Sequence, residues 1–227
     1  MADAARRIIT KHNEIMSEGR PSPTVSAVSE PAAGVLRALW LVGLTAGVSV
    51  LLALGGEGAR LALRYEREAV FAGEWWRLLT GHFVHGGLAH LLLNVAGLGL
   101  IAGLFPRDYS LRQWLIVGSA SIAAIDLGFV LFEPQLTWYV GLSGLLHGAL
   151  AAGAVSWWRH ESRLLAGSLS AVLVGKLAWE QWRGALPLSG DMNVIVDAHL
   201  YGALGGLLAG LGICLYLQRW SLRPRSL

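Results

Sequence analysis

Ser143 and His199 are isolated polar residues, and each stands at the start of a long apolar stretch of the chain. Ser143 lies in Gly-Leu-Ser-Gly (141–144), and His199 lies in Ala-His-Leu-Tyr-Gly (198–202). A serine hydroxyl becomes a nucleophile when a nearby imidazole accepts its proton, and the same imidazole can later protonate the leaving group. If the fold brings the two side chains together, they can attack a carbonyl carbon.

Further polar residues have the spacing expected of a site that stabilises an oxyanion. His90 and Asn94 are four residues apart, so they share one face of a helix, and His147 follows Ser143 by the same interval. His90 and Asn94 are predicted to donate to the oxyanion, together with the backbone N–H of Ser143 if that residue begins a helix. No third residue that orients His199 is evident from the sequence. Asp197 is interpreted as an entrance or surface charge.

The composition indicates how these residues are positioned. The chain is 54% hydrophobic and 15% charged over 227 residues, which is too apolar for a soluble domain of this size. A membrane-spanning helix needs about 20 mostly apolar residues. Six stretches approach that length and predict an all-α membrane protein with six spans: 36–54, 88–105, 113–132, 142–158, 164–182 and 198–217.

The arginine and lysine residues predict the orientation of these spans. With the N-terminus inside, twelve of the eighteen flank the cytoplasmic ends, which follows the positive-inside rule, and both termini are cytoplasmic. The predicted organisation is a flexible cytoplasmic arm (1–34), a six-helix membrane domain (35–218) with an outer interfacial loop (55–87), and a short basic tail (219–227). The second, fourth and sixth helices then all begin at the outer side. Their polar residues therefore share one depth, which is typical of a functional site.

Small residues predict which helices pack closely. Gly144, Gly148 and Ala152 recur every four residues in the fourth helix, and the sixth helix carries a matching stripe at 202, 206 and 210. Such stripes allow two membrane helices to approach at backbone distance. Close packing along these stripes would bring Ser143 toward His199.

Taken in order, the motifs resemble those of the rhomboid intramembrane serine proteases over residues 74–210. The residues that carry the resemblance are Trp76-Arg77, His85, His90 to Asn94, Gly141 to Gly144, and Ala198-His199 followed by Gly202 and Gly206. The resemblance implies a six-helix bundle in a bacterial inner membrane. It also implies a Ser143–His199 catalytic pair facing the periplasm, oxyanion stabilisation by His90 and Asn94, and a structural role for Trp76 and Arg77 in the outer loop.

One residue narrows the resemblance to a branch of that family. Many rhomboids carry an aromatic residue one turn after the serine, whereas this chain has His147, and the run from Gly141 to Gly148 resembles the rhombosortases. The resemblance implies substrates that are secreted proteins with a C-terminal tail made of a Gly-Gly motif, an apolar helix and basic residues. His147 is then expected to support His199 rather than replace it. A general rhomboid protease that cuts single-span proteins is the alternative.

Other readings are less well supported by the residues. His82, His85 and His90 lack the spacing of a zinc site, and neither a metal nor a cofactor is predicted. The basic residues form no stripe with stacking aromatics, so nucleic acid is not an expected partner. A transporter would need a polar path through the whole membrane, and a non-catalytic client-binding relative would usually lack Ser143 or His199. Asp126 and Lys176 lie at comparable depth in the third and fifth predicted helices, and Glu180 is one turn from Lys176. A structural ion pair among these three residues is favoured over a functional relay.

Overall fold

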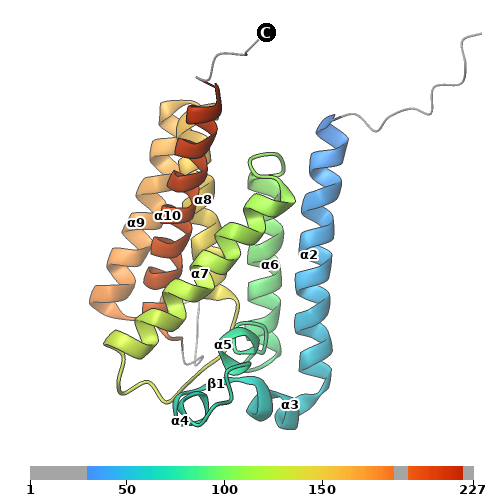
Figure 1. Cartoon of the computed structure of the whole chain (residues 1–227), viewed down its shortest axis with the longest axis vertical. Coiled ribbons are helices and arrows are strands. Elements are labelled where there is room, and N and C mark those ends of the chain that lie inside the picture. The colour runs from blue at the N-terminus through green and yellow to red at the C-terminus, as the bar shows by residue number, and fades with distance from the viewer. Residues whose placement is uncertain (1–29, 187–193, 222–227) are drawn as a thin grey trace, which may run out of the picture. The chain divides into compact units, whose positions relative to one another are not determined.

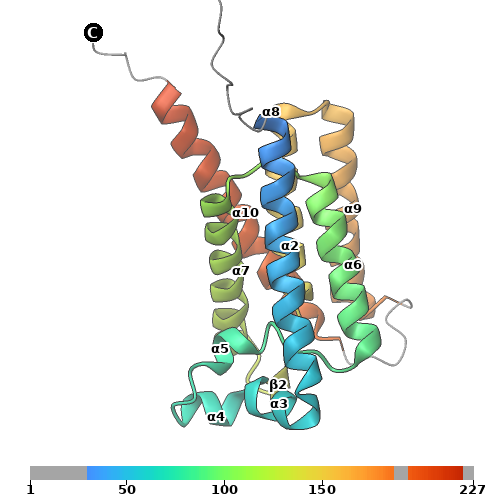
Figure 2. The same cartoon turned by 90° about the vertical axis from the view of Figure 1, so that its right-hand side faces the viewer.

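The computed structural model describes residues 30–186 and 194–221 of the chain. Most of these residues are helical (Figures 1 and 2). The elements in chain order are α2 (Glu30–Leu54), α3 (Gly56–Leu63), β1 (Tyr65–Glu66), α4 (Arg67–Phe71), α5 (Arg77–Thr80), α6 (Leu88–Leu104), α7 (Leu111–Phe132), β2 (Trp138–Tyr139), α8 (Ser143–His160), α9 (Arg163–Arg183) and α10 (Val196–Ser221).

Six long helices, α2 and α6 to α10, occur where the six apolar stretches predict them, within a few residues at each end. Among the described residues, α7 and α10 are long and apolar enough to cross a membrane, and α2 with α3 adds a third span if this pair, bent by 115°, is counted as one. α6 is a shorter apolar helix. α8 is rich in glycine and alanine, and α9 carries charged residues, which lowers the hydropathy of both helices. The count of six spans therefore remains a prediction.

The domain boundaries in the sequence remain predictions as well. The basic tail falls largely outside the described residues, and so does the arm apart from its last residues, where α2 begins at Glu30. The chain divides into two units, 1–33 and 34–227, and the helices that carry the polar residues of interest all belong to the second.

α8 and α10 pack at backbone distance through their glycines. A Cβ atom at Gly202 would overlap the carbonyl oxygen of Gly144, and one at Gly206 would overlap that of Gly148. Figure 1 shows α10 running beside α8. The predicted small-residue stripes are thus the contact surface between these two helices, and they fix the first turn of α8 against the first turn of α10.

The connection between α8 and α9 is only two residues long, so the two helices run antiparallel. Ser162 caps α9 by accepting a hydrogen bond from the backbone N–H of Leu165. α8 has 18 residues and α9 has 21, and both rise about 1.5 Å per residue. The end of α9 that contains Glu180 therefore returns to the level where α8 begins at Ser143.

The outer loop holds α3, α4, α5 and β1, which lie together at one end of the long helices (Figures 1 and 2). β1 and β2 form a two-residue antiparallel pair in which Tyr65 faces Tyr139. The described residues are mostly helical, as predicted, and this two-residue pair is a feature that the sequence did not predict. Each strand is only two residues long, so the sequence shows no alternating pattern that would predict it. The pair connects the outer loop to the segment that leads into α8.

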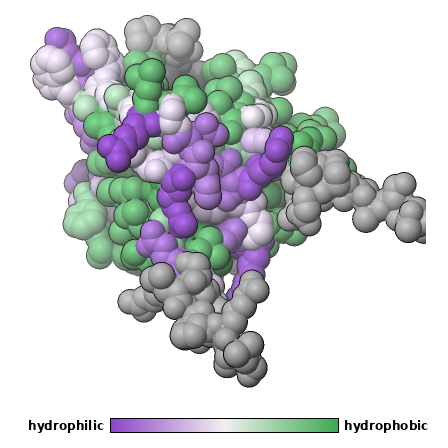
Figure 3. Space-filling view, turned by 90° about the horizontal axis from the view of Figure 1, so that it is seen from above, coloured by the Kyte–Doolittle hydropathy of each residue, from purple (hydrophilic) through white to green (hydrophobic). Residues whose placement is uncertain are grey.

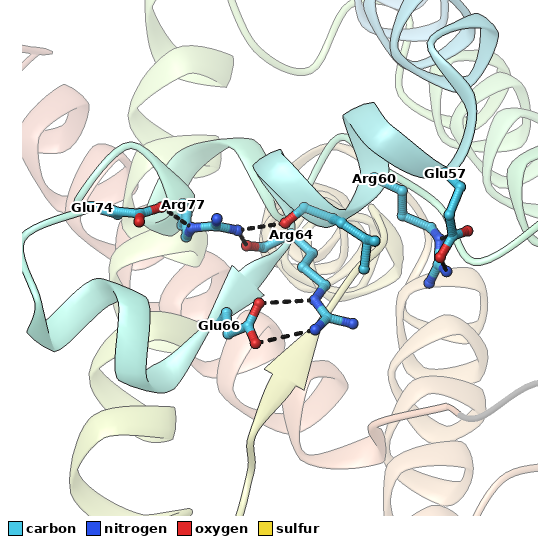
Figure 4. Close-up of polar contacts among 7 residues, drawn as sticks. Glu57, Arg60, Arg64, Glu66, Glu74 and Arg77 are labelled. Carbon is cyan, nitrogen blue, oxygen red and sulfur yellow. Dashed lines mark hydrogen bonds and ion pairs between the residues drawn. The ribbon is translucent and has the colours of Figure 1, made fainter.

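Charged residues connect the parts of the outer loop (Figure 4). The guanidinium of Arg77 donates to the carbonyl oxygens of Leu61 and Arg64 at 2.8 and 2.9 Å and to the carboxylate of Glu74 at 2.6 Å. Arg64 forms a bidentate pair with Glu66, with both distances 3.1 Å. Arg77 thus binds one carbonyl oxygen in the last turn of α3 and one directly after it.

The opposite end of the helices presents a mixed surface. In the view of Figure 3, hydrophilic side chains gather toward the middle of this face and hydrophobic side chains ring them. Large hydrophobic side chains are exposed along the long helices, among them Leu51, Leu92, Phe132 and Leu208. An apolar girdle with polar residues at the helix ends suits a lipid environment.

Candidate active site

Ser143 and His199 are within hydrogen-bond distance. The Oγ atom of Ser143 lies 2.9 Å from Nε2 of His199. Ser143 is the first residue of α8, and His199 lies in the first turn of α10, where the glycine contacts hold the two helix ends together. His199 is buried, with 4% of its surface exposed. The structure therefore brings together the hydroxyl and the imidazole that the sequence predicts to meet.

The other nitrogen of His199 meets a carboxylate that the sequence analysis did not place in the site. Nδ1 of His199 lies 2.9 Å from Oε2 of Glu180, and Oε1 of Glu180 lies 2.6 Å from Nζ of Lys176. Glu180 is thus placed to orient His199, a role for which the sequence made no residue evident. Lys176 and Glu180 form an ion pair, and the second carboxylate oxygen of Glu180 contacts His199. Asp197 sits at the start of α10, half-buried.

A signal for Glu180 was present in the sequence. Glu180 lies near the outer end of the fifth predicted span, at the depth where the second, fourth and sixth spans begin. A carboxyl group inside a membrane span usually faces the interior of the bundle. Reading Glu180 only as the partner of Lys176 one turn away concealed its contact with a different helix.

His147 stacks on His199. The ring centroids are 4.1 Å apart and the ring planes differ by 17°. Nδ1 of His147 lies 2.7 Å from the backbone carbonyl oxygen of Ser143, which can only accept, so Nδ1 carries a proton. His147 therefore contacts the flat face of the imidazole and makes no contact with Ser143 Oγ among the hydrogen bonds of the described residues.

His90 and Asn94 face the turn that precedes Ser143. Gly141 has φ of +120°, and a Cβ there would come within 2.7 Å of Nε2 of His90 and within 3.8 Å of Nδ2 of Asn94. Only glycine fits this close approach without strain. Nδ1 of His90 accepts a hydrogen bond from the backbone N–H of Gly86 at 3.4 Å, so in the neutral ring Nε2 carries the proton. Asn94 donates to the carbonyl oxygen of His90 at 3.0 Å, and its amide has a second proton.

His85 and Tyr139 support this turn from the outer side. His85 is buried and packs edge-on against His90, with 5.1 Å between the ring centroids. Burial lowers the pKa of His85 to about 4, and the neighbouring His90 adds to this effect. The hydroxyl of Tyr139 donates to the carbonyl oxygen of Gly141 at 2.6 Å.

Trp76 and Arg77 lie in the outer loop, away from the Ser143–His199 contact. Arg77 is buried and bonds to the backbone at the end of α3, as described above. Nε1 of Trp76 lies 3.5 Å from the carbonyl oxygen of Ala62. These hydrogen bonds all join residues of the outer loop.

Asp126 does not join Lys176. Its carboxylate lies 3.3 Å from Nε2 of His82, a buried histidine in the outer loop. Asp126 therefore connects α7 to the outer loop.

One cluster among the described residues has the composition of a metal site. Ligand atoms of His147, Glu180 and His199 lie within 4.8 Å of one another. A metal ion lies in the plane of each imidazole that binds it, about 2.1 Å from nitrogen. Two rings stacked nearly parallel cannot both direct a lone pair at one such point. The arrangement fits a hydrogen-bonded histidine better than a metal centre.

The geometry defines a class of protein: a multi-pass helical membrane protein with a serine–histidine–carboxylate site built from three helices. The family model described as the Rhomboid domain matches residues 72–216, which include every helix from α6 to α9 and most of α10. The chain belongs to the rhomboid family.

Three relatives illustrate the similarity. YdcA of Bacillus subtilis, which bears a rhomboid protease name, is 30% identical over 137 residues, covering 60% of this chain and 66% of that protein. Rhomboid protease GluP of the same organism is 26% identical over 151 residues, covering 65% of this chain and 28% of GluP. Rhomboid protease GlpG of Salmonella paratyphi A is 26% identical over 198 residues, covering 83% of this chain and 66% of GlpG. The chain spans less than two thirds of the length of these relatives.

Proposed function

We propose that this chain is an intramembrane serine endopeptidase in which Ser143 is the nucleophile and His199 the general base. The observation that carries the proposal is the 2.9 Å contact between Ser143 Oγ and His199 Nε2. Membership of the rhomboid family and the names of the relatives support it.

The proposed reaction begins when Ser143 Oγ attacks the carbonyl carbon of the scissile peptide bond. His199 Nε2 takes the hydroxyl proton as the new C–O bond forms. The C–N bond then breaks, the imidazolium gives its proton to the departing amine, and an acyl group remains on Ser143. Water then attacks the ester carbon while His199 accepts a proton from it. The bond to Ser143 Oγ breaks, the imidazolium returns the proton to Oγ, and the second product leaves with a new carboxyl group.

The oxyanion formed in these steps needs hydrogen-bond donors. His90 Nε2, the Asn94 amide and the backbone N–H of Ser143 are the proposed donors. Ser143 is the first residue of α8, so its N–H has no partner within the helix. The backbone hydrogen bonds of α8 begin with Leu146, whose N–H donates to the carbonyl oxygen of Leu142.

The finer assignment concerns orientation and substrate. We propose six membrane spans with both termini in the cytoplasm of a bacterium, and a site near the periplasmic face of its inner membrane. The substrates proposed are membrane-anchored proteins, in particular secreted proteins with a C-terminal Gly-Gly tail. The support for this substrate is the resemblance of the run from Gly141 to Gly148, including His147, to the rhombosortases. A general rhomboid protease acting on single-span proteins is the second candidate, favoured by the names GluP and GlpG.

A cleavage assay with a single-span reporter tests the enzyme assignment. Ser143→Ala and His199→Ala should each abolish cleavage while the folded protein accumulates normally in the membrane. Ser119→Ala, on the exposed side of α7, is the matched control and should cleave at the normal rate. Full activity of both site variants would exclude the Ser143–His199 pair.

The substrate is tested in the native cell. After deletion of the gene, surface proteins that retain their C-terminal apolar tails are identified by mass spectrometry. Retained tails that begin with Gly-Gly support the sorting protease. Retained fragments of other single-span proteins favour the general protease instead.

A further inference from the structure

Glu180 and Lys176 occupy a position that the proposed dyad does not require. Glu180 is 3% exposed and lies in α9, and an isolated carboxylate that is buried to this degree would be strongly disfavoured. Its two oxygens are divided between two partners, with Oε2 on His199 and Oε1 on Lys176. This arrangement compensates the buried charge and, at the same time, links α9 to α10 at the proposed base.

The hydrogen bonds around His199 require a definite tautomer. For Ser143 to be activated, Nε2 of His199 must accept the hydroxyl proton, so Nδ1 must carry the ring proton. An ionised carboxylate only accepts hydrogen bonds, and Glu180 therefore holds the proton on Nδ1. A protonated Glu180 could donate to Nδ1 and leave Nε2 protonated, which would turn the imidazole away from base catalysis. The ammonium group of Lys176 favours the ionised carboxylate and so favours the productive tautomer.

Residues of α8 and α9 restrain the imidazole of His199, which is carried by α10, in complementary ways. His147 from α8 contacts its flat face, and Glu180 from α9 holds the edge opposite Ser143. Stacking fixes the plane of the ring but permits rotation within that plane. A hydrogen bond at Nδ1 fixes the rotation, because Nδ1 and Nε2 must then meet Glu180 and Ser143 at once.

We propose that Glu180 is a positioning residue that converts the Ser143–His199 pair into a serine–histidine–glutamate triad, and that Lys176 keeps Glu180 ionised for this role. The inference rests on the proposed function, since it assigns the group that orients the base. When the imidazolium forms during the reaction, the negative charge of Glu180 also stabilises it. Neither Glu180 nor Lys176 exchanges a proton with the substrate.

Purified full-length protein in phospholipid vesicles, with a fluorogenic single-span reporter, tests this proposal. Glu180→Gln keeps the size of the side chain but removes its charge and lets the amide donate to Nδ1. We expect kcat to fall roughly 100- to 10,000-fold, the upper end being the loss known for the equivalent change in soluble serine proteases. KM should stay within about threefold, because Glu180 does not touch the substrate. Glu180→Asp should recover part of the lost kcat.

Lys176 and Asp197 provide the second variant and the control. Lys176→Gln should lower kcat by about tenfold at unchanged KM, and Lys176→Arg should restore it. Asp197→Asn removes a charge two residues from His199 and should leave both constants within twofold. Should Glu180→Gln fail to accumulate, Lys176→Gln decides the matter, and an unchanged kcat in that variant overturns the proposal.

A fluorophosphonate probe separates the failure of this inference from failure of the proposed function. The probe reacts with an activated serine and needs no natural substrate. If Ser143→Ala abolishes labelling while Glu180→Gln labels and cleaves at the normal rate, the positioning role is wrong and the protease assignment stands. If Ser143→Ala is still labelled and still cleaves the reporter, the protease assignment itself fails. Slow labelling of Glu180→Gln in proportion to its kcat supports the triad.

Discussion

The imidazole of His147 lies parallel to that of His199, with 4.1 Å between the ring centroids and 17° between the planes. The two histidines come from different helices, and the contact places a flat surface against the proposed base. Many rhomboids have another aromatic residue one turn after the serine. In this chain the residue is His147, whose Nδ1 also donates to the backbone carbonyl oxygen of Ser143.

Replacing His147 tests the value of this stacking. His147→Ala should lower kcat/KM by about two- to tenfold, because an aromatic pair of this kind contributes about 0.5–1.5 kcal/mol. His147→Phe keeps a flat ring and should stay within about threefold of the native protein. Initial rates on the single-span reporter measure both. Equal losses in the two variants would contradict a role based on ring stacking and would point to the hydrogen bond at Nδ1.

Removing the Asn94 amide tests the oxyanion assignment. Asn94→Ala should lower kcat about 100- to 1000-fold with little change in KM, since an oxyanion donor acts mainly in the transition state. Leu93→Ala, next to it on the exposed side of α6, is the matched control and should be active. Steady-state kinetics at several substrate concentrations separate kcat from KM. A rise in KM alone would place Asn94 in substrate binding instead.

The contact between α8 and α10 makes a prediction about stability. Gly206→Ala places a methyl group against the carbonyl oxygen of Gly148 and should lower the free energy of unfolding by about 1–3 kcal/mol. Gly212→Ala, in the same helix, meets no atom within 4 Å and should leave stability unchanged or slightly raised. Reversible unfolding in detergent micelles measures both. Equal stability of the two variants would contradict the close contact between Gly206 and Gly148.

His85 makes a prediction about pH. Its folded pKa of about 4 is below its unfolded value of about 6.5, so the unfolded chain binds the proton more tightly. The contribution of His85 to stability is complete above pH 6.5 and is lost as the pH falls toward 4, by up to about 3 kcal/mol. In His85→Phe, the free energy of unfolding should depend less on pH between about 6.5 and 4. Unfolding in detergent at pH 7 and pH 5 checks it, and equal slopes in both proteins would contradict it.

The parts of the site that could be predicted were those marked by local pattern. Ser143 and His199 stand out because each is a lone polar residue in an apolar stretch, and helix direction places them at one depth. The long helices follow from apolar length, and their ends agree with the structure to within a few residues.

The parts that could not be predicted depend on contacts between elements. The depth of Glu180 in the fifth span indicates that it faces the interior of the bundle, but Lys176 one turn away already supplies a partner. Only the packing of α9 against α10 reveals the contact with His199. The pairing of Tyr65 with Tyr139 joins residues far apart in the chain through strands too short to have a period. In both cases the contact joins residues of different elements, and the sequence around each residue does not indicate the partner.

The base lies on a helix that is synthesised after the one that bears the nucleophile. While a ribosome is still adding residues between α8 and α10, Ser143 is already in the nascent chain and His199 is not. Ser143 acquires its proton acceptor only when α10 has been inserted and its glycines have docked on those of α8. Under the proposed mechanism, the newly made chain cannot cleave neighbouring membrane proteins until its assembly is complete.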